Sequence, residues 1–78
     1  MLTANAVLDH YYLEVRCMLM EIAATLDRFD RAVEQEGDES AQQDPRLAQL
    51  QAALDMLADR KNTTNRSEQL LLHFSDLD

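Results

Sequence analysis

The segment "HYYLEVRCMLMEIAATL", residues 10–26, has apolar residues at steps of three and four and contains neither glycine nor proline. That spacing places most of its apolar side chains on one face of an α-helix. The whole chain of 78 residues contains one Gly and one Pro, and 46% of its residues are hydrophobic. Because β-branched runs are also scarce, the sequence predicts an all-α fold.

The first helix is predicted to run from about residue 4 to residue 36. Thr3 or Asn5 can cap the free N–H groups at its start, and Gly37 supplies a stop at its end. Segment 37–44 is polar and acidic and has no side chains to bury. It is therefore expected to be an exposed connection.

Two shorter helices are predicted after this connection. The second helix, about 45–61, begins with Asp44 as its N-cap and a proline at the first helical position, where a missing N–H costs nothing. The short third helix, about 66–75, can be capped by Thr64 or by Asn65. The chain is thus expected to form one helical-hairpin domain, residues 1–78.

The large apolar side chains of the first helix fall within an arc of roughly 120°. A helix of about 33 residues is roughly 50 Å long, whereas the second helix is about half as long. Part of the arc would stay in water, and helical hairpins commonly bury such surfaces by pairing. We therefore expect an antiparallel hairpin that dimerises into a four-helix bundle. The expected interface contains Tyr11, Tyr12, Val15, Met18, Leu19 and Ile22, with Leu13 and Met20 from a smaller apolar patch.

Four side chains with metal-binding chemistry lie in a line on another side of the first helix. His10, Glu14, Cys17 and Glu21 are separated by four, three and four residues, and they fall within about 60° of one another. The simplest interpretation is a solvated face on which His10 and Glu14 form an i,i+4 pair. For Cys17 taken by itself, the preferred interpretation is a small apolar side chain in a helix contact.

A metal site is the alternative interpretation of the same line. If a second chain covered this side, buried carboxylates would be costly unless they bound a cation. The ligand chemistry resembles that of ferritin-like di-iron bundles, although no Glu-x-x-His motif occurs here. The alternative is therefore a ferritin-like bundle of two chains that holds a divalent or iron-type ion through His10, Glu14 and Glu21.

Composition limits the classes of partner and the compartment. Fifteen acidic residues against seven basic ones give a net charge of -8, which disfavours nucleic acids and anionic membranes and favours a basic protein surface. The single cysteine fits a reducing compartment, so we expect the cytoplasm. No signal peptide is visible, and no stretch reaches the roughly 20 apolar residues of a spanning helix.

No arrangement of residues calls for catalysis. Cys17 and His10 are about two turns apart on one rigid helix, too far for one to activate the other directly. We therefore expect a small acidic protein that is not an enzyme and uses no cofactor. It is expected to act as an adaptor or assembly protein through contacts with a second copy of itself or with another protein.

Overall fold

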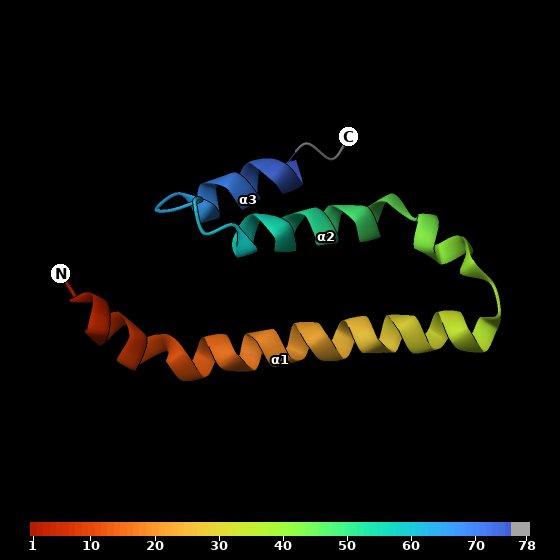
Figure 1. The fold of residues 1–78 in the computed structure, drawn as a ribbon, viewed down its shortest axis with the longest axis horizontal. Coiled ribbons are helices and arrows are strands. Elements are labelled where there is room, and N and C mark those ends of the chain that lie inside the picture. The colour runs from red at the N-terminus through yellow and green to blue at the C-terminus, as the bar shows by residue number, and fades with distance from the viewer. Residues whose placement is uncertain (76–78) are drawn as a thin grey trace. The chain divides into compact units, whose positions relative to one another are not determined.

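The computed structural model describes residues 1–75, which fold into helices joined by short connections (Figure 1). The order is α1 (Ala4–Glu36), the 3₁₀ helix η1 (Glu39–Gln43), α2 (Pro45–Ala58) and α3 (Arg66–Ser75). All regular structure in this part of the chain is helical, which confirms the all-α prediction and its three α-helices.

The structure contains two compact units, and the single domain expected from the sequence stays a prediction. The first unit ends at Asp38 and contains α1, and the second begins at Glu39 and contains the other helices. Residues 76–78, which the predicted domain includes, lie outside the described residues.

The 33 residues of α1 begin and end where the capping residues predict. Thr3, rather than Asn5, is the N-cap, because its hydroxyl oxygen accepts a hydrogen bond from the backbone N–H of Ala6 at 3.1 Å. At the other end, the N–H of Gly37 donates to the carbonyl of Val33 at 3.1 Å. Gly37 has a φ of 66°, a left-handed conformation that glycine adopts without a Cβ clash.

The predicted connection between the first two helices is partly ordered as η1. Ala41 is half-buried, and its carbonyl accepts from the N–H of Asp44 at 3.1 Å. This bond closes η1 directly onto the residue that caps α2. Segment 37–44 is therefore exposed for most of its length, as predicted, but it contains a short helical turn that its polar composition did not indicate.

Asp44 fixes the start of α2 in the predicted way. Its Oδ1 accepts from the backbone N–H of Arg46 at 2.8 Å, and its Oδ2 lies 2.8 Å from Nη2 of the Arg46 guanidinium. The side-chain and backbone hydrogen bonds from Arg46 lower the pKa of Asp44 from 3.8 to about 2. Pro45 occupies the first helical position.

The end of α2 comes at Ala58, about three residues before the predicted end. Two side chains form hydrogen bonds with backbone groups there. The Asp59 carboxylate accepts from the N–H of Lys61 at 3.0 Å, and the side-chain amide of Asn62 donates to the carbonyl of Met56 at 3.2 Å. These local bonds offer the backbone an alternative to another helical turn. The chain therefore turns earlier than its helix propensity suggests.

The helices α2 and α3 run antiparallel side by side, as Figure 1 shows. His73 Nε2 donates to the carbonyl of Gln49 at 2.9 Å across this contact. Gln49, Ala53 and Met56 share a face of α2 about 60° wide, and Ala53 is only 8% exposed. His73 is half-buried and links the two helices.

We expect the Asp44→Asn variant to lose the charge of the cap while an amide oxygen still caps α2. Because the folded-state pKa is the lower one, the charged carboxylate stabilises the fold above the ordinary value of 3.8 and loses this effect as the pH falls towards 2. The thermal midpoint by circular dichroism should therefore differ between wild type and variant at neutral pH, and the two should converge in acid. A constant difference over that range would contradict the charged cap.

The His73→Ala variant should loosen α3 from α2. Loss of one half-buried hydrogen bond costs about 0.5–1.5 kcal/mol of the free energy of unfolding. Hydrogen exchange should accelerate at the backbone amides of α3 while the amides of α1 keep their rates. The His10→Ala variant is the matched control, since His10 is exposed; equal acceleration in both variants would rule out this role for His73.

Candidate functional site

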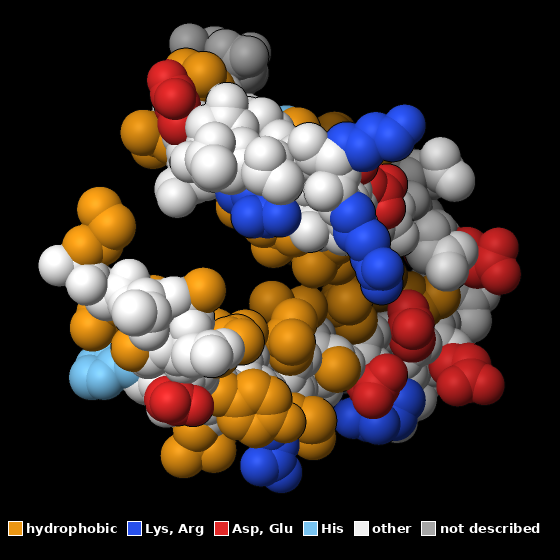
Figure 2. Space-filling model, turned by 60° about the vertical axis from the view of Figure 1, so that its left-hand side comes forward, with side chains coloured by type: hydrophobic (Ala, Val, Ile, Leu, Met, Phe, Trp, Pro, Cys, Tyr) orange, Lys and Arg blue, Asp and Glu red, His pale blue; other side chains and the backbone are white. Residues whose placement is uncertain are grey.

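The N-terminal half of α1 exposes a continuous apolar surface, and Figure 2 shows hydrophobic side chains gathered along this helix. Their fractional exposure runs from 39% for Ile22 to 65% for Tyr12. A run of large apolar side chains on one helix face typically marks an interaction site. We call this surface the α1 stripe; it consists of Val7, Leu8, Tyr11, Tyr12, Val15, Met18, Leu19 and Ile22.

The same face of α1 becomes less exposed toward its C-terminal end. Leu26 and Phe29 are half-buried, and Val33 is 9% exposed. These three residues continue the helical spacing of the α1 stripe.

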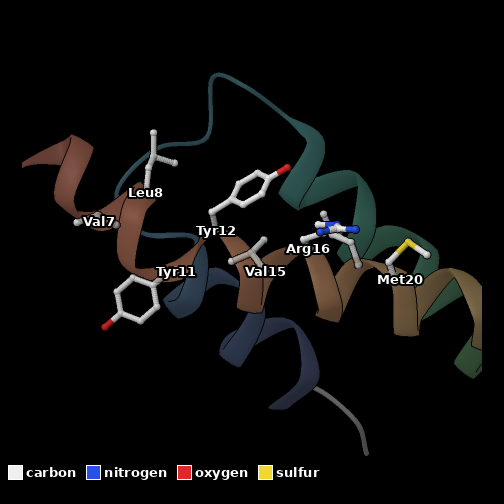
Figure 3. A pocket seen from close by; sticks show the side chains of 8 residues that line it. Val7, Leu8, Tyr11, Tyr12, Val15, Arg16 and Met20 are labelled. Atoms are coloured by element: carbon white, nitrogen blue, oxygen red, sulfur yellow. The ribbon is translucent and has the colours of Figure 1, made fainter.

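A shallow groove of about 440 Å³ lies along the α1 stripe. Figure 3 shows the side chains that line it, all of which project from α1. Seven of these residues are apolar or aromatic, and the eighth is Arg16. A groove with this lining can bind an apolar side chain, with one cation available at its edge to orient an acidic group. The lining residues are Val7, Leu8, Tyr11, Tyr12, Val15, Arg16, Leu19 and Met20.

Arg16 joins the α1 stripe to the smaller apolar patch. It lies four residues after Tyr12 and four before Met20, so the three side chains form one row along the helix, as Figure 3 shows. Arg16 is not among the site residues predicted from the sequence. Its spacing from Tyr12 and Met20 was the signal that could have identified it.

The smaller apolar patch is exposed as well. Leu13 is 63% exposed and Met20 is 67% exposed, while Ala24 is half-buried. All eight side chains of the expected interface are thus accessible in the single chain. Leu13 lies on the side of α1 that carries Cys17, about 160° from Val15, so the two apolar surfaces point in different directions.

The residues of the predicted metal site lie apart on the exposed surface of α1. His10, Glu14, Cys17 and Glu21 are all exposed. The His10 ring packs edge-on against Tyr11, with 4.8 Å between ring centroids. No three His, Cys, Asp or Glu side chains within residues 1–75 come together closely enough to hold a metal ion. A site at His10, Glu14 and Glu21 would need ligands from a second chain, as the alternative interpretation supposed.

Comparisons of the chain with known protein families, with characterised proteins and with solved structures find no match. None of the helices in the described part of the chain combines the length and the apolar character needed to cross a membrane.

The reactivity of the Cys17 thiol measures whether its side of α1 is accessible to solvent. It is an exposed free thiol, on the side away from the α1 stripe, so a maleimide should label it in the native protein nearly as fast as in urea. The matched variant is Cys17→Ala combined with Val15→Cys, which moves the single thiol onto the α1 stripe. We expect the Val15→Cys thiol to react slowly with maleimide at high protein concentration, where association would cover the α1 stripe. Slow labelling of Cys17 in the native protein, with fast labelling of the Val15→Cys thiol, would show that the covered side of α1 is the one that carries Cys17.

Proposed function

We propose that this chain is a small protein-interaction module, an adaptor or assembly protein with no chemistry of its own, which self-associates through the α1 stripe. The observation that carries the proposal is the exposure of eight large apolar side chains on one face of one helix. Burying the exposed half of such a side chain contributes roughly 1 kcal/mol. The α1 stripe can thus supply the favourable free energy that association needs.

The proposed assembly is a four-helix bundle made of two α1–α2 hairpins. A second apolar surface supports it, because α2 carries a leucine seam about 115° from the face that contacts α3. Leu50 and Leu57 in this seam are 48% and 44% exposed. The seam, made of Leu47, Leu50, Leu54 and Leu57, is available to pack against apolar surface of another helix.

The net charge of -8 shapes the choice of partner. Two copies repel each other through this charge, and added salt screens the repulsion. Self-association should therefore strengthen from low to moderate ionic strength. A second protein with a basic surface would be attracted instead, and a reducing compartment such as the cytoplasm suits the single free thiol.

Sedimentation equilibrium tests this proposal directly. At micromolar concentration the wild-type chain should sediment with twice the mass of one chain, and the Leu19→Glu variant should sediment as a monomer because dimerisation would bury two new carboxylates. The Leu72→Glu variant is the matched control, since Leu72 of α3 and Leu19 are both 59% exposed. A folded wild-type monomer that does not associate would contradict the proposal.

A further inference from the structure

We propose that the α1 stripe is covered by α1 of a second copy of the chain running antiparallel, with Asp9 of each copy paired to Arg16 of the other. This inference rests on the proposed self-association and specifies its geometry. In this arrangement α1 of the second copy occupies the groove beside Arg16.

The length of the helices favours α1 as the occupant. The 14 residues of α2 are roughly 21 Å long, against roughly 50 Å for the 33 residues of α1. With the register described below, residues 4–22 of α1 lie alongside the same residues of the second copy, a length of roughly 27 Å that includes the whole α1 stripe. A second α1 brings an apolar surface with the same length and helical spacing.

An antiparallel arrangement with its two-fold axis near residue 13 pairs the stripe with itself. At this register Tyr11 lies opposite Val15 of the second copy, and Leu8 lies opposite Met18 of the second copy. The aromatic ring of Tyr11 thereby meets the shorter side chain of Val15 across the contact, which favours interdigitation. The exposed segments, Val7 to Ile22 in each copy, overlap along most of their length.

The charges beside the α1 stripe fit this orientation. Asp9 and Arg16 are both exposed, and they lie within about 20° of each other on one flank of the stripe. In an antiparallel pair each flank meets the same flank of the other helix. With the axis near residue 13, Asp9 and Arg16 of the other copy come to nearly the same height, and symmetry forms this attractive pair twice.

A parallel arrangement loses this complementarity. Each flank would then meet the opposite flank of the other helix, which carries Glu14 and Glu21. Arg16 would be attracted to Glu14 or Glu21 of the second copy, but Asp9 would be repelled by Glu14 of the second copy. Charged residues at such flanking positions set helix orientation, so the antiparallel pair is preferred.

Charge reversal tests the pairing in the full chain by sedimentation equilibrium. Asp9→Lys places a lysine opposite Arg16 of the other copy and should weaken the dimer about tenfold relative to Glu21→Lys. Glu21→Lys is the matched control, because it changes the net charge equally at a position that faces no charged residue in the antiparallel pair. The double variant Asp9→Lys, Arg16→Glu keeps the wild-type net charge, exchanges the two partners and should restore wild-type affinity.

The orientation has an independent readout in the distance between spin labels. In a chain with Cys17→Ala and Thr25→Cys, the two labels of an antiparallel dimer should be separated by roughly 36 Å along the helix axis. A parallel dimer would hold them at the same height, within about 20 Å of each other.

Other results would contradict the orientation, the charge pair or the self-association separately. Tighter association of Asp9→Lys than of Glu21→Lys, or a short label distance, would show a parallel dimer. Equal affinities of these two variants would remove the Asp9 and Arg16 pair, while self-association through the α1 stripe would stand. A monomeric wild-type chain would instead contradict the proposed function itself, and with it this pairing.

Discussion

The exposed apolar surface of the α1 stripe is the feature on which the proposed assembly depends. A single helix gains little stability in water from its backbone hydrogen bonds alone, because most helical stability in proteins comes from packing an apolar face. The stripe presents side chains such as Tyr12 and Leu19 that are more than half exposed. Covering them would account for the length of α1, for its continuous helical spacing and for the proposed assembly.

The unit that begins at Glu39 is stabilised differently. Its helices are short, and polar bonds position them: the Asp44 cap starts α2, Asn62 closes its end, and His73 connects α3 to it. Ala53 is the buried hydrophobic residue of this unit among the residues described. A small helical unit with so little apolar burial has limited stability of its own. Packing of the leucine seam of α2 against another apolar surface would therefore stabilise it.

Local signals in the sequence predicted the helices well. Thr3, Gly37 and Asp44 act within one turn of their own positions, so residue type and spacing were enough to place both ends of α1 and the start of α2. The end of α2 was placed too late because the competing bonds of Asp59 and Asn62 depend on how the following turn folds.

Contacts between distant residues were not predictable in the same way. The bond from His73 to the Gln49 carbonyl joins residues 24 positions apart, and nothing in the periodicity of either helix indicates it. Helical spacing was enough to place Arg16 between Tyr12 and Met20. However, a single charged side chain at the edge of an apolar helix face is usually just exposed to solvent, so its type alone did not indicate a site. In the structure, Arg16 lines the groove together with apolar side chains.

The helicity of the chain as a function of its concentration tests the central claim most directly. If the α1 stripe is buried only in an assembly, dilution from about 100 μM to below 1 μM should lower the helical circular dichroism signal, because α1 loses its packing as the chains separate. The account predicts that this loss coincides with the fall in molecular mass measured on the same samples. Helicity that stays constant while the chain is monomeric throughout this range would contradict it.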